Sequence, residues 1–172
     1  MKAINPFPSS SSASKACSVR DMAVKDWQLR LVQLLAVPGI IISYYLLLFH
    51  NGDLIAACGV GGWDDCGAVS GPDAPYSAIG PVPVALIGLL GYASIFLLTW
   101  LKDWLPPLEE YLPEIMVGMV GLAFLFSLFL TGLELFVIGA FCRYCVVSAV
   151  IVTVMFVLSL SYLRNPNVET AR

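Results

Sequence analysis

Charged side chains are scarce in this sequence of 172 residues. Only 12% of the residues are Asp, Glu, Lys or Arg, whereas 59% are hydrophobic, and the mean hydropathy is +0.85. Soluble domains carry a charged share of about 25%. The composition therefore excludes an ordinary soluble domain and indicates an integral membrane protein.

Motifs for nucleic-acid binding and for bound electron carriers are also missing. The nine Lys and Arg residues form no basic cluster interleaved with aromatic residues, which excludes a nucleic-acid surface. The sequence has no haem-attachment motif, no dinucleotide-binding glycine fingerprint and no iron–sulfur cysteine spacing. If the chain transfers electrons, the acceptor that remains is one dissolved in the membrane.

Apolar runs make up most of what is present. A helix of about 20 apolar residues, rising 1.5 Å per residue, crosses a hydrocarbon core of about 30 Å. Four such runs occur, at residues 31–49, 84–101, 115–138 and 141–163. We predict an all-α membrane protein, a four-helix transmembrane bundle over residues 31–163, with an N-terminal tail at 1–30 and a C-terminal tail at 164–172.

The basic residues predict the orientation of these spans. Short segments rich in Lys and Arg stay on the cytosolic side of a membrane. With both tails cytosolic, only Arg143 faces out, and the other eight basic residues lie inside: Lys2, Lys15, Arg20, Lys25, Arg30, Lys102, Arg164 and Arg172. The loop at 51–82 and the junction at 139–145 are then both extracytoplasmic, on the oxidising side.

The last apolar run opens with a Cys-x-x-Cys pair, Cys142 and Cys145. Residues three apart share one face of a helix, so the two sulfurs can close a small disulfide. The helix N-terminus and the neighbouring Arg143 favour the thiolate, which is the reactive form of cysteine. The pattern indicates a dithiol that switches between two redox states.

A second cysteine pair, Cys58 and Cys66, lies in the Gly-rich loop on the same predicted side. Two simpler interpretations remain open: static disulfides that hold a non-catalytic membrane scaffold, or a zinc site of four thiolates. The seven residues between the loop cysteines and the position at the membrane edge fit zinc poorly. The fifth cysteine, Cys17 in the tail, has no evident partner. We favour a redox relay between the two pairs.

A relay that ends in the membrane needs a quinone or a similar acceptor. Cys145 is one helical turn deeper than Cys142 and is therefore the thiol nearer the hydrocarbon. Side chains near the outer rim are candidates for the walls of a quinone pocket, namely Ser70, Tyr76, Ser77 and Tyr144, although each is equally ordinary as an interfacial residue.

Taken together, these motifs resemble the vitamin K epoxide reductase family over about residues 30–163. The similarity rests on Cys66-Gly-Ala-Val69, on the Tyr-Ser-x-x-Gly stretch from Tyr76 to Gly80, and on Phe-Cys-Arg-Tyr-Cys-Val-Val-Ser-Ala at the fourth span. Other four-span disulfide oxidases carry their Cys-x-x-Cys in the first outer loop, so they resemble this chain less.

The resemblance implies an enzyme, a membrane thiol:quinone oxidoreductase that forms disulfides in secreted proteins. Its bacterial and plastid members often carry a fused thioredoxin-like domain, so here a separate thioredoxin-like partner is expected. A bacterial plasma membrane is the expected location, with a thylakoid membrane as the alternative. The quinone could be ubiquinone, menaquinone or phylloquinone, and reduction of vitamin K epoxide by the same relay is the alternative activity.

The resemblance also implies an order of electron flow. The partner attacks Cys58, the released Cys66 attacks Cys142, and Cys145 faces the quinone. One departure from the family concerns a loop serine that lies near the quinone, because the corresponding positions here are Pro72 and Ala74. Ser70 or Ser77 is the expected substitute.

Overall fold

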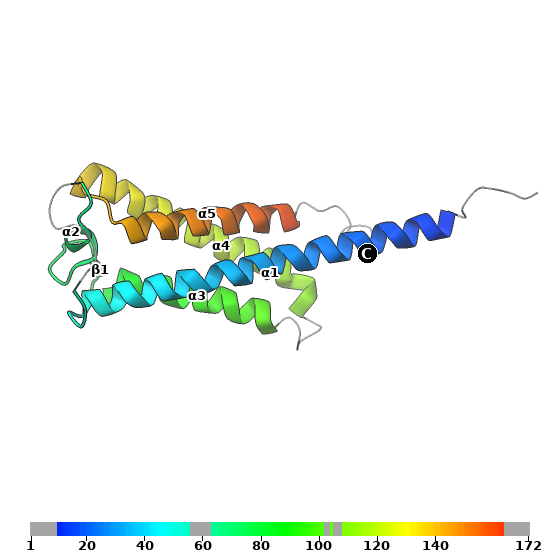
Figure 1. Ribbon diagram of the computed structural model, residues 1–172, viewed down its shortest axis with the longest axis horizontal. Helices are drawn as coiled ribbons and strands as arrows, with labels where there is room; N and C mark the ends of the chain where they lie inside the picture. The colour runs from blue at the N-terminus through cyan, green and yellow to red at the C-terminus, as the bar shows by residue number, and fades with distance from the viewer. Residues whose placement is uncertain (1–9, 56–62, 102–103, 105–107, 164–172) are drawn as a thin grey trace, which may run out of the picture.

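The computed structural model describes residues 10–55, 63–101, 104 and 108–163. Within these residues, four long helices lie side by side (Figure 1). They are α1 (Ser10–His50), α3 (Val84–Leu101), α4 (Leu108–Leu133), which the π-helical turn η1 (Glu134–Ile138) extends, and α5 (Arg143–Leu163). The predicted all-α bundle is confirmed.

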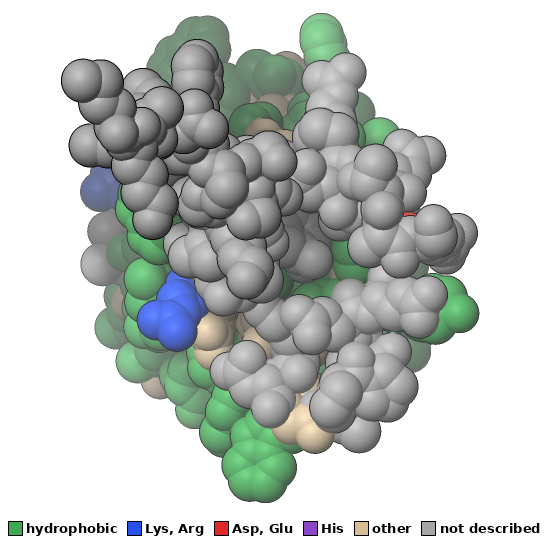
Figure 2. Space-filling view, turned by 90° about the vertical axis from the view of Figure 1, so that its right-hand side faces the viewer, with side chains coloured by type: hydrophobic (Ala, Val, Ile, Leu, Met, Phe, Trp, Pro, Cys, Tyr) green, Lys and Arg blue, Asp and Glu red, His purple; other side chains and the backbone are tan. Residues whose placement is uncertain are grey.

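Each long helix contains a segment that is long and apolar enough to cross a membrane. In the described part of the chain these segments are Trp27–His50, Val84–Leu101, Tyr111–Ile138 and Arg143–Ser161. Large apolar side chains on their outer faces, such as Leu122 and Phe136, are exposed. Hydrophobic side chains also surround the rim of the bundle when it is viewed from the end where α1 begins (Figure 2). The chain is an integral membrane protein.

Helix α1 is longer than the predicted first span. It begins at Ser10, so its backbone is helical through much of the predicted polar tail at 1–30, and only its second half is apolar enough to span a membrane. The boundaries of the two tails and the side of the membrane on which they lie stay predictions.

The core of the bundle is built from apolar side chains of all four helices. Val32 and Ala36 of α1 pack with Ile95 of α3, Met116 of α4 and Met155 of α5. Such close-packed contacts hold the helices at fixed positions, because a core at crystal-like density leaves little room for sliding.

Helices α1, α3 and α5 meet at one further contact. A Cβ atom at Gly39 would overlap the ring of Tyr92, so glycine lets α1 and α3 approach closely. The Tyr92 hydroxyl in turn forms a 2.8 Å hydrogen bond with the Ser148 hydroxyl of α5.

The connection between α1 and α3 forms a small cap at one end of the bundle (Figure 1). It holds the short helix α2 (Cys66–Ser70), whose N-cap Asp65 accepts a hydrogen bond from the N–H of Ala68. A hairpin follows, in which β1 (Ala78–Ile79) pairs antiparallel with β2 (Val82–Pro83). The start of α5 lies at the same end, so the two predicted outer segments are together.

Candidate functional site

Main-chain hydrogen bonds join the cap to the residues just before α5. The N–H of Phe141 donates to the carbonyl of Trp63 at 2.7 Å, and the N–H of Asp65 donates to the carbonyl of Phe141 at 3.1 Å. These bonds place Cys66, the next residue of the cap, beside Cys142, the next residue before α5. Two segments about 76 positions apart in sequence are thereby held in register.

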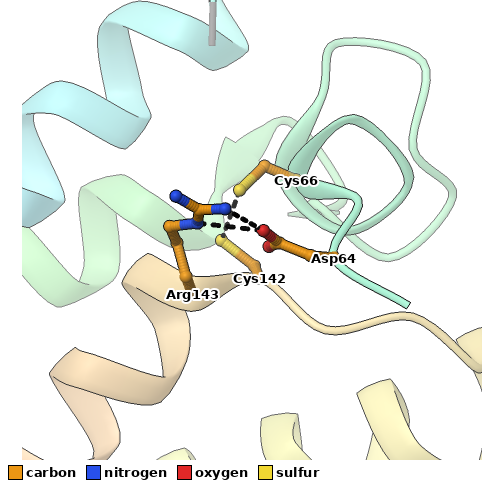
Figure 3. A network of polar contacts seen from close by, with 4 residues as sticks. All are labelled: Asp64, Cys66, Cys142 and Arg143. Atoms are coloured by element: carbon orange, nitrogen blue, oxygen red, sulfur yellow. Dashed lines mark hydrogen bonds and ion pairs between the residues drawn. The ribbon is translucent and has the colours of Figure 1, made fainter. Parts of the chain in front are cut away.

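The sulfurs of Cys142 and Cys66 are in contact. The Cys142 thiol donates to the Cys66 sulfur at a distance of 3.3 Å (Figure 3). Cys66 is in a disulfide bond, whereas Cys142 and Cys145 are free thiols. A thiol this close to a disulfide sulfur is placed for thiol–disulfide exchange. The predicted partner of Cys66 is Cys58, which lies outside the described residues, so that pairing stays a prediction.

The contact is closed to water. Cys66 and Cys142 are both 0% exposed, and they pack with Leu46, Val69 and Ala140. A small reagent in solution therefore has no direct access to either sulfur in this state. The disulfide of Cys66 also weakens the zinc interpretation, because metal ligation requires thiolates.

Hydrogen bonds stabilise the Cys142 thiolate. They come first from the Cys145 thiol, then from the backbone N–H groups of Cys145 and Tyr144, and together they lower the pKa of Cys142 to about 7, against the opposing effect of burial. At neutral pH a large share of Cys142 is therefore thiolate, the form that attacks disulfides and that leaves from them.

Arg143 connects the start of α5 to the cap. Its guanidinium forms an ion pair with Asp64 of the cap, with Nε 3.0 Å from Oδ2 (Figure 3). That hydrogen bond lowers the pKa of Asp64. The largest effects that stabilise the Cys142 thiolate are those of S–H and N–H donors, and Arg143 also interacts electrostatically with Cys142. Both partners are well exposed, so the pair orients the cap more than it stabilises the fold.

A cavity of about 430 Å³ opens beside Cys145, between the helices. Its walls are mainly apolar and include Ile87 of α3 and Met119 of α4. Cavities with apolar walls and a few polar groups suit small planar ligands. The lining combines these apolar walls with hydroxyl groups and a thiol, which suits a small planar ligand that carries a few polar atoms.

Three of the four predicted pocket residues line this cavity: Ser70, Tyr76 and Ser77. The Ser70 hydroxyl lies 3.7 Å from the Cys145 sulfur, whereas the Ser77 hydroxyl donates to the carbonyl of Ala74 at 2.8 Å. Of the two candidates for the family's loop serine, Ser70 is therefore the one in contact with the deeper thiol.

Tyr144, the fourth predicted pocket residue, is directed elsewhere. Its ring packs against Tyr45 of α1, with centroids 5.0 Å apart, and it does not belong to the cavity lining. Adjacent residues on a helix point in different directions, so Tyr144 and Cys145 face different neighbours.

Other polar residues of the cavity were not predicted from the sequence: Ser43, His50, Tyr92, Ser127, Thr131, Glu134 and Ser148. His50 follows the first apolar run and resembles an ordinary interfacial residue. Glu134 had a usable signal, because it is the only acidic residue inside the four predicted spans. An ionisable residue within a membrane span is rare and usually functional.

The fold and these contacts define a class of protein: a four-helix membrane protein in which a Cys-x-x-Cys dithiol meets a loop disulfide beside an apolar cavity. The family model for the vitamin K epoxide reductase family matches residues 30–160, and the chain belongs to that family. The resemblance inferred from the cysteine motifs is thus confirmed. Membership makes the chain a membrane oxidoreductase, in a family that acts on thiols and is generally linked to quinones.

Proposed function

We propose that the chain is a thiol:quinone oxidoreductase that drives disulfide formation in secreted proteins. Electrons pass from a separate thioredoxin-like protein to Cys58 and Cys66, then to Cys142 and Cys145, and then to a quinone. The observation that carries the proposal is the 3.3 Å contact between the Cys142 thiol and the disulfide-bonded Cys66. It joins the two cysteine pairs into one path.

The transfer between the pairs consists of two exchanges that balance in bonds and electrons. The Cys66 thiolate attacks Cys142 in the Cys142–Cys145 disulfide, and Cys145 leaves with one electron pair. The Cys58 thiolate then attacks Cys66, which re-forms the loop disulfide and releases Cys142. Two electrons have moved inward. In the structure Cys66 is in a disulfide, and Cys142 and Cys145 are free thiols. This is the state that follows the transfer.

The low pKa of Cys142 supports the second exchange. A thiol that leaves easily speeds the breaking of a disulfide, and leaving ability rises as the pKa falls. With a pKa of about 7, Cys142 leaves as a stable thiolate at neutral pH.

The cavity supports a quinone as the final acceptor. Cys145 lines it, and so does Ser70, whose hydroxyl is within contact distance of the Cys145 sulfur. A quinone there takes up two electrons and two protons while Cys142 and Cys145 return to a disulfide. Ser70, Tyr76 and Ser77 are the proposed quinone-binding residues.

The partner and the location rest on the predicted orientation. Cys66 of the cap lies at the end of the bundle opposite the start of α1 (Figure 1), and Trp63 nearby is 80% exposed beside the pairing with Phe141. We place the thioredoxin-like partner on that extracytoplasmic side, at a bacterial plasma membrane or a thylakoid membrane.

The test is quinone reduction by the purified protein in lipid nanodiscs. With dithiothreitol as donor, loss of quinone absorbance is followed separately for ubiquinone, menaquinone and phylloquinone. We expect turnover with at least one quinone and a loss of at least about 100-fold in Cys145→Ser, because the thiol next to the cavity is gone.

Cys17→Ser is the matched control, since it removes a thiol outside the proposed relay, and its rate is expected to equal that of the unaltered protein. Absence of turnover with every quinone would favour the static scaffold, and full turnover in Cys145→Ser would exclude Cys145 as the donor.

A further inference from the structure

Glu134 is a buried acid in the wall of the cavity. Its side chain is 4% exposed, although it lies in the spanning segment Tyr111–Ile138. Burying an ionisable group away from water costs free energy unless the group is hydrogen-bonded, and proteins rarely keep one in a membrane without a use. The proposed relay assigns no use to it.

The local backbone directs Glu134 into the cavity. It is the first residue of the π-helical turn η1, and its carbonyl accepts a 2.9 Å hydrogen bond from the N–H of Gly139, five residues later. Gly139 closes the turn in the left-handed conformation, with φ of 69°. Single π-helical turns inside helices are frequent at functional sites, because they redirect one side chain.

The carboxyl group interacts with the Cys142–Cys145 dithiol. The Cys145 thiol and the backbone N–H of Cys142 both lie within interaction range of it. The one hydrogen of the Cys145 thiol can point to the Cys142 sulfur or to this carboxyl, and it is the hydrogen that Cys145 must lose when it is oxidised. The N–H of Cys142 favours a position of the carboxyl at the start of α5, so that this position does not depend on the thiol alone.

We propose that Glu134 is the proton carrier of the quinone reaction: it takes the proton of the Cys145 thiol and donates it to an oxygen of the quinone in the cavity. The inference rests on the proposed function and adds a catalytic residue to it.

The proton and electron balance is as follows. The Cys142–Cys145 dithiol gives up two electrons and two protons as one S–S bond forms, and the quinone becomes a hydroquinone. One proton travels through Glu134, whose carboxylate is restored when it donates. The other proton is that of Cys142, which is released to the outer aqueous side and is replaced at the hydroquinone by one from the same side.

The other titratable groups that face the cavity serve this purpose less well. They are His50 at the end of α1, Tyr76 of the cap, Tyr92 of α3 and Cys145 itself. The Tyr92 hydroxyl is bonded to Ser148. Among the described contacts of Cys145, Ser70 offers a hydroxyl, which is a poor base, and Glu134 offers a carboxylate. The Cys142 sulfur also accepts from the Cys145 thiol, but it bonds to Cys145 when the dithiol is oxidised and therefore cannot carry a proton to the quinone.

The first test needs no quinone. In a Cys142→Ser background, Cys145 is alkylated with N-ethylmaleimide in detergent, and the modified site is identified by peptide mapping. With Glu134 as internal base, the rate depends weakly on pH below neutrality. In Glu134→Gln we expect the alkylation rate at pH 7 to be about 100-fold lower, which is the lower end of general-base effects. We also expect that rate to rise about tenfold per pH unit, because hydroxide in solution must then remove the proton.

Glutamine keeps the size of the side chain and its hydrogen bond to the N–H of Cys142, so the structure of the turn is retained. A role limited to electrostatic repulsion predicts the opposite result, because removing a negative charge favours the thiolate. The inference would therefore be overturned if Cys145 is alkylated in Glu134→Gln as fast as in the protein that keeps Glu134, or faster.

The second test separates the two transfers in the complete protein. In Glu134→Gln we expect quinone reduction to fall about 100-fold. Electron transfer from the cap to Cys142 and Cys145, followed by mass-tagging of free thiols, should stay unchanged. Glu114→Gln is the matched control: this residue is an exposed acid of α4, and we expect no change in either rate.

The outcomes distinguish this inference from the proposed function. If the unaltered protein reduces no quinone, the proposed function fails. If it does and Glu134→Gln turns over equally fast, only the role of Glu134 fails. Should Glu134→Gln not assemble, Glu134→Asp replaces it. Its shorter side chain withdraws the carboxyl from Cys145, so we expect at least about tenfold slower alkylation and turnover, and unchanged rates would again overturn the proposal.

Discussion

At the scale of single residues, the site depends on which donors face each sulfur. The thiol of Cys145 and two backbone N–H groups stabilise the Cys142 thiolate, whereas the guanidinium of Arg143 is paired with Asp64. Thiolate character is therefore a property of the Cys-x-x-Cys turn itself.

The titration of Cys142 tests this account. In the reduced Cys142–Cys145 state we expect the Cys142 thiolate to appear with a midpoint of about pH 7, so that it is mostly thiol below that pH and mostly thiolate above it. The signal is the ultraviolet thiolate absorbance of the protein minus that of Cys142→Ser. Cys145→Ala removes the strongest donor and should move the midpoint up toward the ordinary cysteine value of about 8.5.

Arg143→Gln is the control for that titration, because it leaves all three donors in place. We expect a midpoint close to that of the unaltered protein. A large upward shift in Arg143→Gln, with none in Cys145→Ala, would mean that the charge of Arg143 is the main cause.

At the scale of the elements, the turn between α4 and α5 is the part on which the site depends most. Gly139 ends η1 with a positive φ, and the next residues run extended so that Phe141 pairs with Trp63. A residue with a side chain adopts this conformation only at a cost of roughly 1–2 kcal/mol.

Gly139→Ala should therefore lower the free energy of unfolding by about 1–2 kcal/mol and slow the exchange between Cys66 and Cys142. A Cβ at Gly139 meets nothing within 4 Å, so the expected loss comes from the backbone alone. Denaturant unfolding and thiol mass-tagging are the two measurements.

Gly118→Ala is the counterpart within α4, where an added Cβ also meets nothing within 4 Å. Alanine is the better helix former, so we expect a gain of about 0.5–1 kcal/mol and unchanged exchange. Equal effects of the two substitutions would show that the left-handed turn has no special importance.

Some of these elements could be predicted from the sequence and others could not, for physical reasons. A bilayer requires long apolar helices, so the four spans follow from the hydropathy alone. The cavity depends on how four helices pack, and η1 departs from the regular helix that Glu134 would otherwise continue. Tyr144 was predicted to line the pocket because it lies near the outer rim, but its ring points to Tyr45 of α1. No local pattern specifies these features.

At the scale of the whole molecule, the described part of the cap, with Cys66, lies at the same end of the bundle as Cys142 and Cys145. The structure brings the two predicted outer segments together (Figure 1). Their side of the membrane follows from the distribution of Lys and Arg, and it is a separate prediction.

That orientation can be tested with a membrane-impermeant maleimide on intact spheroplasts of a bacterial host. Ile55→Cys, at a position that is 96% exposed beside the cap, should be labelled from outside. Ser161→Cys, at an exposed position near the other end of α5, should be labelled only after the membrane is broken. The reverse pattern would invert the proposed compartments.

The complete burial of Cys66 and Cys142 determines which reductants the enzyme can accept. Small thiols in the surrounding fluid cannot reach these two sulfurs directly, however favourable their reduction potentials are. In the proposed relay, electrons therefore enter at Cys58, the predicted disulfide partner of Cys66. Access to that cysteine then selects among donors of similar reduction potential, and a protein that docks there has an advantage over thiols that meet it only by diffusion.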